Sequence, residues 1–218
     1  MLVDTGTVDD TAEVALRAGA RVVHAAWPGH VAQKNRALAE AVRGWVLSLD
    51  ADEWLTPEAW EQVRSAIATP AGAVGFSLPR CNHWLGTPLR HGRWYPDRKV
   101  RVVRRGAGRW VGDDPHDQLQ VDGLVRPLPG DIAHVPYRSL GEHLRTIDRY
   151  TEIAARSLGD RGVRARLWDP PAHAALHWID AVLFRSAWRD GVPGMAVATL
   201  GAAYSGLKWW RLWRRAGR

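Results

Sequence analysis

The stretch Trp45-Val46-Leu47-Ser48-Leu49-Asp50-Ala51-Asp52-Glu53 decides the fold of this 218-residue chain. Its first five residues form an apolar run of strand length, and carboxylates follow at once. In α/β proteins, ligands bind at the carboxyl ends of such strands. Two carboxylates two positions apart can both reach one hard cation, and Mg²⁺ and Mn²⁺ prefer oxygen ligands. The same pair is common in caps and solvated turns, so its context decides between the two interpretations.

The segments on either side of this stretch alternate between strand and helix patterns. We expect strands at 1–4 and 21–24, and helices at 11–18, 30–42 and 57–68. Pro57 suits the first position of the last of these helices. This order predicts a doubly wound, largely parallel sheet. Asp4, Asp50 and Asp52 would then lie at the strand ends.

Residues 72–134 differ in character, because Pro, Gly and Trp recur there at short spacing. Strand-like pieces occur at 73–78, 100–103 and 131–135. We interpret this region as irregular loops with short antiparallel strands, a usual place for an acceptor site.

Helical patterns return after this region, at 139–158, 172–189 and 193–215. The chain therefore divides, in this prediction, into a domain of residues 1–138 and a helical extension of residues 139–218.

The positive charge of the chain is concentrated in this extension. The formal net charge is +7, and residues 181–218 carry seven basic residues against the single Asp190. The rest of the chain is close to neutral, so nucleic acid is not an expected partner. On a helix, Trp209, Trp210 and Trp213 share one face, opposite Lys208, Arg211 and Arg215. This pattern predicts binding to an anionic membrane surface. Docking on the core or on a partner protein are the alternatives.

Composition excludes several other classes of protein. Hydrophobic residues make up 46% and charged residues 24%, as in a globular protein with a real core. The one cysteine cannot form an internal disulfide. The N-terminus shows no signal-peptide pattern, and no apolar run is long enough to predict a transmembrane helix.

Several motifs occur in a recognisable order. They are Val3-Asp4-Thr5-Gly6-Thr7-Val8-Asp9-Asp10-Thr11, Trp27-Pro28-Gly29, Gln33-Lys34-Asn35 and the carboxylate stretch, followed by Gly92–Asp97, Arg101–Arg105, His116-Asp117, His134 and Arg189-Asp190-Gly191. This set resembles family-2 glycosyltransferases of the GT-A fold, in particular the branch of lipopolysaccharide-core β-glucosyltransferases. The resemblance covers nearly the whole chain. It implies an α/β fold with a Rossmann-like sheet for nucleotide-diphospho-sugars and a helical C-terminal extension.

The resemblance also implies roles at the donor site. Asp4 would bind the nucleotide base or ribose, and Asp9 would support that loop, although Asp9 also suits a helix N-cap. Lys34 would reach the diphosphate, with a solvated helix position as the alternative. Asp50 would contact ribose or sugar, and Asp52 would bind Mg²⁺ or Mn²⁺.

Inverting transfer further requires a carboxylate base. Family members carry His-Glu near the position of His116-Asp117, so Asp117 is the expected base, with Asp113 and Asp114 as rivals and a surface turn as the alternative. His134 is either a further metal ligand or a satisfied buried histidine. Arg98, Arg101 and Arg104 either face phosphate or an anionic sugar, or form a solvated strand face.

Family members begin with a strand and a helix before the Val-Asp-x-Gly element, which here starts at residue 3. A misplaced start codon, a fragment or a degenerate enzyme would explain this, and we favour the first two. The expected function is inverting, metal-dependent transfer from a nucleotide-diphosphate-sugar to a lipid-linked or cell-envelope glycan. The expected location is the cytoplasmic face of the membrane. The alternative is a catalytically inactive peripheral membrane protein that keeps a truncated GT-A shell.

Overall fold

The chain folds into two compact units in the computed structural model, which describes residues 1–4, 6–112 and 117–216. The first unit consists of residues 1–79 and 98–132, and the second of residues 80–97 and 133–218. Residues 80–97, which we assigned to the first predicted domain, thus belong to the unit with the C-terminal helices. The boundary after residue 138 stays a prediction, because compactness alone does not define a domain.

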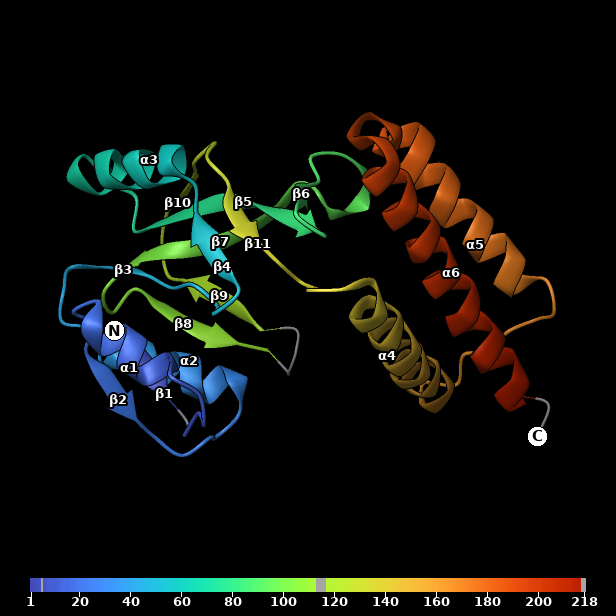
Figure 1. The fold of residues 1–218 in the computed structure, drawn as a ribbon, viewed down its shortest axis with the longest axis horizontal. Coiled ribbons are helices and arrows are strands. Elements are labelled where there is room, and N and C mark those ends of the chain that lie inside the picture. Colours follow the sequence, from blue (N-terminus) through green and yellow to red (C-terminus); the bar gives the residue numbers. More distant parts are fainter. Residues whose placement is uncertain (5, 113–116, 217–218) are drawn as a thin grey trace. The chain divides into compact units, whose positions relative to one another are not determined.

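Two short parallel strands begin the first unit (Figure 1). β1 (Leu2–Asp4) pairs with β2 (Val22–His24), and Asp4 lies opposite His24. Helix α1 (Thr11–Arg17) connects them and ends shortly before Gly19, which has the left-handed φ of 78° that often follows a helix. The strand–helix–strand order predicted for this part of the chain is confirmed.

The main sheet has seven strands in the order β3-β7-β5-β11-β4, with β10 and β6 also paired to β5. Its strands are β3 (Trp45–Leu47), β4 (Glu53–Leu55), β5 (Gly75–Trp84), β6 (Thr87–Pro88), β7 (Asp97–Arg104), β10 (Val125–Pro127) and β11 (Ile132–His134). β3 pairs with β7 in antiparallel orientation, whereas β10 pairs with β5 in parallel. The sheet is therefore mixed and not largely parallel, while the predicted α/β class is confirmed.

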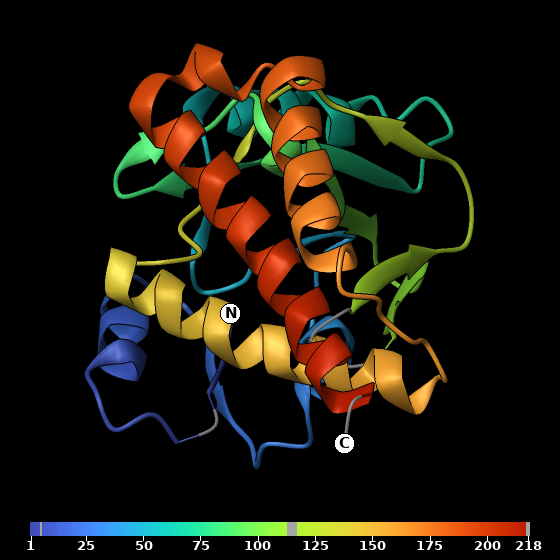
Figure 2. The same cartoon turned by 90° about the vertical axis from the view of Figure 1, so that its right-hand side faces the viewer.

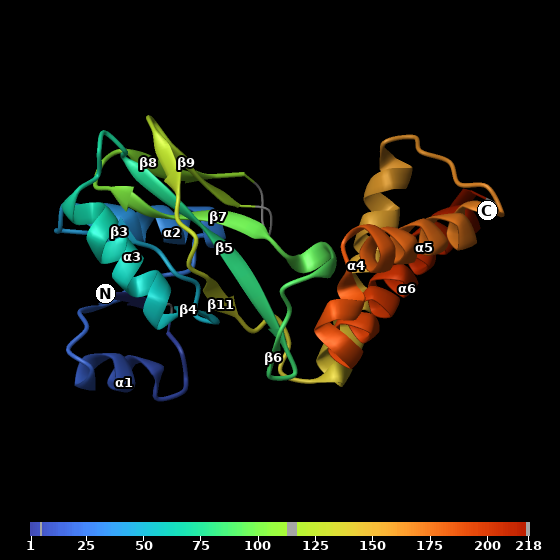
Figure 3. The same cartoon turned by 90° about the horizontal axis from the view of Figure 1, so that it is seen from above.

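The middle of the chain supplies the long strands of this sheet (Figure 3). The strands predicted at 73–78, 100–103 and 131–135 correspond to β5, β7 and β11, but β5 and β7 are longer than predicted. β5 has ten residues and little exposed surface on either face. Its sequence therefore lacks the alternation that marks a half-exposed strand. Pro79 also argues against an interior strand, because proline cannot donate to a ladder. It falls between residues 75–77, which pair with β10, and residues 83–84, which pair with β6.

Two helices and a strand pair complete the first unit. In α3 (Pro57–Ala68), the N-cap Thr56 hydroxyl accepts a hydrogen bond from the Ala59 N–H at 3.2 Å. Ala59 and Val63 of this helix pack into the core of the main sheet. Helix α2 (His30–Ala39) lies against β8 (Gly108–Val111), which pairs antiparallel with β9 (Gln118–Val121). α2 ends three residues before the predicted end.

The second unit contains three main helices (Figure 2). They are α4 (Leu140–Asp160), α5 (Asp169–Ile179) and α6 (Gly191–Ala216). α4 and α6 confirm the predicted helices at 139–158 and 193–215. The predicted helix at 172–189 was too long, because α5 gives way at Asp180 to a π-helical turn through Phe184. Ser186 has a φ of 55°, which no α-helix tolerates.

The basic face predicted on α6 is largely engaged within the second unit. Arg211 pairs with the Asp148 carboxylate and donates to the Thr151 hydroxyl at 2.8 Å, and Arg215 pairs with Glu152. These partners all lie on α4. The Trp face is divided, since Trp209 stacks on His173 with ring centres 4.1 Å apart, while Trp210 and Trp213 stay exposed. Among the described residues, no helix combines the length and apolar character needed to cross a membrane.

Candidate functional site

Lys34 joins two of the predicted site carboxylates. Its Nζ lies 2.7 Å from Asp50 Oδ1 and 2.7 Å from Asp117 Oδ2. Lys34 lies on α2, Asp50 follows β3, and Asp117 directly precedes β9. All three side chains are partly buried, with exposed fractions of 20% for Lys34, 31% for Asp50 and 11% for Asp117. The fold therefore brings together three residues that the sequence analysis took from separate motifs, and their burial makes these ion pairs stronger than typical surface pairs.

A second cation, Arg101, ties this group to the sheet. Its Nη2 lies 2.8 Å from Asp50 Oδ2 and 2.7 Å from Glu53 Oε1. The side chains of Arg101 and Glu53 are 5% and 0% exposed. A solvated strand face was one of our two interpretations for Arg101, and the structure shows that it was wrong. We assigned no role to Glu53, although it belongs to the same acidic stretch.

These contacts set the protonation states of the site. Burial alone would raise the pKa of Asp50, but Arg101 and Lys34 outweigh it and lower that pKa below its ordinary value. Burial would lower the pKa of Arg101, but the carboxylates of Glu53, Asp50 and Asp117 raise it. Asp50 is therefore ionised and Arg101 charged throughout the neutral range.

Asp52 is the most exposed carboxylate of the group. It lies in the turn before β4, and its negative charge acts to raise the pKa of Asp50, so the two carboxylates interact. Among the described residues, no three His, Cys, Asp or Glu side chains form a metal-binding cluster. Mg²⁺ commonly uses one or two carboxylates together with substrate phosphates. Both oxygens of Asp50 already pair with Lys34 and Arg101, so Asp52 is the carboxylate of this pair that is exposed to a ligand.

Buried polar atoms without partners occur on Trp110 and Arg101, which border this group, and on Gln33, the residue before Lys34. Within the part of the chain that the structure describes, four buried side-chain atoms have no hydrogen-bond partner. They are Oε1 and Nε2 of Gln33, Nε of Arg101 and Nε1 of Trp110. The Trp110 ring lies under Lys34 Nζ, 4.4 Å from it, and is fixed by two hydrogen bonds between its backbone and the Asn35 side chain. Unpaired buried donors are costly, and they mark places where a ligand supplies the missing partner.

Sequence reasoning missed Gln33 and Trp110 as site residues. Gln33 stands beside Lys34 in a quoted motif, but only the fold shows that it is buried. Trp110 is one of 13 tryptophans and had no distinguishing signal.

Other predicted residues lie apart from this group or outside the described residues. The Asp9 carboxylate accepts a hydrogen bond from the Thr11 N–H at 3.1 Å, but the N-cap of α1 is Asp10 and not Asp9. Asp4 ends β1, but its side chain lies outside the described residues, as do Asp113, Asp114 and His116. The roles of Asp4, Asp9 and Asp114 stay predictions.

His134 belongs to the second unit. Its Nδ1 pairs with Asn82 Oδ1 at 2.6 Å, a contact that fits a satisfied histidine. Its role as a metal ligand stays a prediction.

Comparison with known proteins adds a family to this geometry. The model of glycosyl transferase family 2 matches residues 1–116. The lipopolysaccharide core biosynthesis glycosyltransferase LpsC of Rhizobium meliloti is 25% identical over 222 residues, covering 99% of this chain and 82% of that protein.

Shorter stretches match two further proteins. The TPR repeat-containing protein Synpcc7942_0270 of Synechococcus elongatus is 41% identical over 81 residues, which are 37% of this chain and 20% of that protein. The uncharacterized glycosyltransferase RC0292 of Rickettsia conorii is 39% identical over 69 residues, which are 32% of this chain and 24% of that protein. The chain thus spans most of LpsC and about a quarter or less of the other two.

Proposed function

The chain belongs to glycosyl transferase family 2 and so is a glycosyltransferase of the GT-A fold, and on that premise we propose that it catalyses inverting, metal-dependent sugar transfer. The donor is a nucleotide-diphosphate-sugar, and the acceptor is a lipid-linked or cell-envelope glycan at the cytoplasmic face of the membrane. The name of LpsC, a lipopolysaccharide core biosynthesis enzyme, supports this acceptor class. The observation that carries the proposal is the partly buried ion-paired group formed by Lys34, Asp50 and Asp117.

Charge supports the metal requirement. Lys34 and Arg101 contribute two positive charges to the group, whereas Asp50, Asp52, Glu53 and Asp117 contribute four negative ones. This set of side chains has a net charge of about −2, which a divalent cation balances. Asp52 would hold the ion, with Asp50 beside it. When bound, the ion would neutralise charge on the diphosphate leaving group as a Lewis acid.

The protein's own groups supply the rest of the chemistry. Asp117 takes the proton of the acceptor hydroxyl as that oxygen forms a bond to the anomeric carbon. The bond from the anomeric carbon to the diphosphate breaks, and its electron pair leaves with the nucleoside diphosphate. Lys34 holds the Asp117 carboxylate in place through their 2.7 Å contact. Trp110 Nε1, on the ring beside Lys34, would donate a hydrogen bond to the donor and so gain the partner that it lacks.

Separate measurements of binding and turnover test this proposal. Purified protein is mixed with nucleoside diphosphates and Mn²⁺ or Mg²⁺, and the shift in Tm is recorded. Release of nucleoside diphosphate is then followed with matching sugar donors and a lipid-linked acceptor. We expect Asp52→Asn to abolish the metal-dependent part of the Tm shift. Asp117→Asn should keep the shift while transfer falls by about 10²-fold or more.

Asp122→Asn is the matched control, because Asp122 is an exposed carboxylate of the same unit outside the group. It should leave both readouts unchanged. Full transfer by Asp52→Asn would refute the metal role. Nucleotide binding without any transfer by the unaltered chain would favour the catalytically inactive alternative.

A further inference from the structure

The segment that joins α5 to α6 places its large apolar side chains on the outside. This connecting segment, Leu183–Val192, reads Leu-Phe-Arg-Ser-Ala-Trp-Arg-Asp-Gly-Val. Leu183 is 64% exposed, Phe184 79%, Trp188 58% and Val192 82%. Single exposed apolar residues are ordinary, but four within ten positions form a patch, and such patches mark interaction sites.

The small and acidic residues of the same segment point inward. Ala187 is buried, and the Asp190 carboxylate accepts a hydrogen bond from the His91 N–H at 2.8 Å and pairs with His91 Nδ1 at 2.6 Å. The carbonyl of Arg185 accepts the Gly92 N–H at 2.8 Å. Backbone and side-chain hydrogen bonds therefore hold the segment in a conformation that leaves its large apolar side chains exposed.

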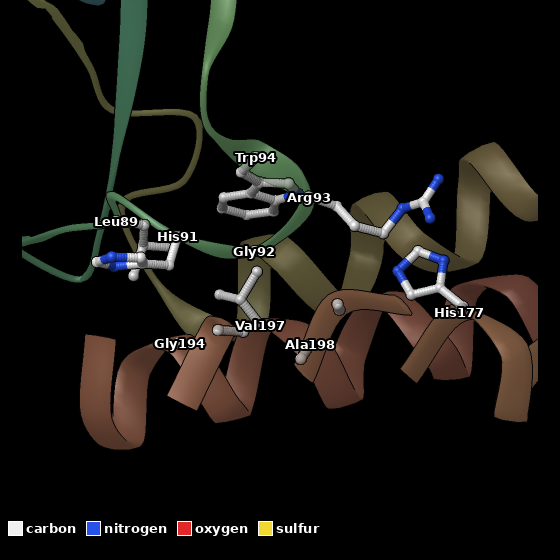
Figure 4. Close-up of a pocket in the computed structure, with 11 residues that line it drawn as sticks. Leu89, His91, Gly92, Arg93, Trp94, His177, Gly194, Val197 and Ala198 are labelled. Atoms are coloured by element: carbon white, nitrogen blue, oxygen red, sulfur yellow. The ribbon is translucent and has the colours of Figure 1, made fainter. Parts of the chain in front are cut away.

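The interior behind the segment has no room for these apolar groups. Figure 4 shows Gly92 and Trp94 on one side of a cavity and Gly194, Val197 and Ala198 of α6 on the other. Its volume is about 20 Å³, enough for roughly one water molecule. A Cβ on Gly194 would lie 2.1 Å from the Ala187 carbonyl oxygen, so the backbones already touch. The outward position of Phe184 and Trp188 is thus built into the fold.

The exposed charges around the patch are basic. Arg185 and Arg189 flank the apolar residues, while the Asp190 carboxylate is turned inward against His91. The Asp180 carboxylate pairs with both Arg185 and Arg93, so these three side chains together carry a net positive charge. Apolar and aromatic side chains beside arginines match an anionic lipid surface, because the rings enter the headgroup region while the guanidinium groups stay with the phosphates.

We propose that the connecting segment Leu183–Val192 is the surface by which the protein binds anionic membranes. This inference rests on the membrane location in the proposed function and identifies the surface responsible. The apolar side chains of Leu176 and Ile179 on α5 are also exposed, seven and four positions before Leu183, and extend the patch along that helix.

The basic Trp helix at the end of α6 is less suited to this role. Arg211 and Arg215 are already paired with carboxylates on α4. Lys208 is half-buried, and burial lowers its pKa. In the connecting segment, by contrast, Arg189 is exposed and the carboxylate next to it is turned away.

Vesicle co-sedimentation of the full chain tests the proposal. Vesicles of phosphatidylcholine alone are compared with vesicles of phosphatidylcholine and phosphatidylglycerol. We expect binding to the anionic vesicles only. Phe184→Glu combined with Leu183→Glu should weaken it by at least about tenfold, because two apolar side chains are lost from the interface. Arg189→Gln should weaken it about fivefold at low salt. The altered side chains are exposed, so the fold should persist, as circular dichroism would verify.

Trp210→Ala combined with Trp213→Ala is the matched control, since it removes two other exposed tryptophans of the same unit. It should change vesicle binding less than about twofold. Loss of binding in this control but not in the Phe184 and Leu183 variant would overturn the proposal in favour of the C-terminal helix. Absence of vesicle binding would also overturn it, and a dimer that the same variant dissociates would assign the patch to a second copy. The Tm shift with nucleoside diphosphates needs no membrane, so it shows separately whether the donor-site proposal stands.

Discussion

Arg101 forms ion pairs with two carboxylates of the first unit. Its guanidinium is the partner of the fully buried Glu53 and also binds Asp50. A buried ion pair adds little stability compared with apolar residues of similar size in its place. Removing one partner, however, leaves the other charge buried without a counter-charge. The strand pairing between β3 and β7 continues at this point, since the Ser48 N–H donates to the Arg101 carbonyl at 2.8 Å. The residue thus connects the sheet to the acidic turn.

Arg101→Met should therefore lower the free energy of unfolding by about 3–5 kcal/mol. Urea unfolding followed by circular dichroism measures this loss. Arg98→Met is the matched control, because Arg98 is exposed and its guanidinium donates to the Leu128 carbonyl at 3.1 Å. The control should stay within about 0.5 kcal/mol of the unaltered protein. Equal losses in both variants would contradict a special role for the buried pair.

Acid should weaken the group through Asp50. Its pKa is lower in the folded protein than its ordinary value of 3.8, despite burial, because Arg101 and Lys34 favour the ionised form. The resulting stabilisation is fully present above the ordinary pKa and is lost as pH falls through the folded pKa. Unfolding free energies of the unaltered protein and Asp50→Asn, compared from about pH 6 to about pH 2, should therefore converge toward the acid end. A constant or widening difference would show that ion pairing of Asp50 does not stabilise the fold.

At the same scale, the sequence did not reveal how its candidate residues pair with one another. Lys34, Asp50 and Asp117 were chosen from separate motifs, and the fold joins them within 2.7 Å contacts. Arg101 was misjudged because its alternating strand neighbours do not reveal which face meets an acidic turn. That information lies in the pairing of β3 with β7, which no local pattern encodes.

Helices α5 and α6 lie close together because glycine occupies the contact. A Cβ added at Gly201 of α6 would lie 2.4 Å from His177 Nε2 on α5, a distance that side chains cannot accept. Burial, followed by Arg93, lowers the pKa of His177, so the ring stays neutral at this contact near neutral pH. The close packing of α5 against α6 therefore requires glycine at position 201.

Gly201→Ala should destabilise the second unit by about 1–3 kcal/mol, because either the imidazole or the helix must move. Gly159→Ala is the matched control in α4, where the nearest atom would lie 3.7 Å from the new Cβ. Helix propensity predicts that this control stabilises the protein by up to about 1 kcal/mol. Thermal unfolding of both variants measures the difference. Stabilisation by both would mean that His177 moves aside at no cost.

Elements with clear local signals were predicted well. α3 has Pro57 and a threonine cap, and α4 has Ser139, whose hydroxyl accepts the Glu142 N–H at 3.1 Å. The predicted strand ended too early in β5, because burial on both faces removes the alternation of apolar and polar residues. Proline is also rare in strands, and Pro79 lies within this one. The end of α5 was missed because the residues after Ile179 continue an apolar helical pattern through a π-helical turn.

For the whole molecule, the α/β class and the helical C-terminal part followed from the sequence, whereas the division into units did not. Residues 80–97 read as part of the first domain because they follow the acidic stretch without a linker. Their apolar side chains pack elsewhere, since Trp84 and Leu89 share a core with Val197 of α6. Contacts between segments so far apart in sequence are invisible to any reading of local periodicity.

This interleaving of the two units has a consequence for the newly made chain. The ribosome releases residues 80–97 well before the helices that cover them, which lie within 133–218. At about 5–20 residues per second, synthesis of that later part takes roughly 4–17 s. Throughout this interval Trp84, Leu89 and Trp94 have no α6 to pack against. The nascent protein therefore passes through a stage in which chaperones would find exposed tryptophan and leucine in the middle of an otherwise complete first unit.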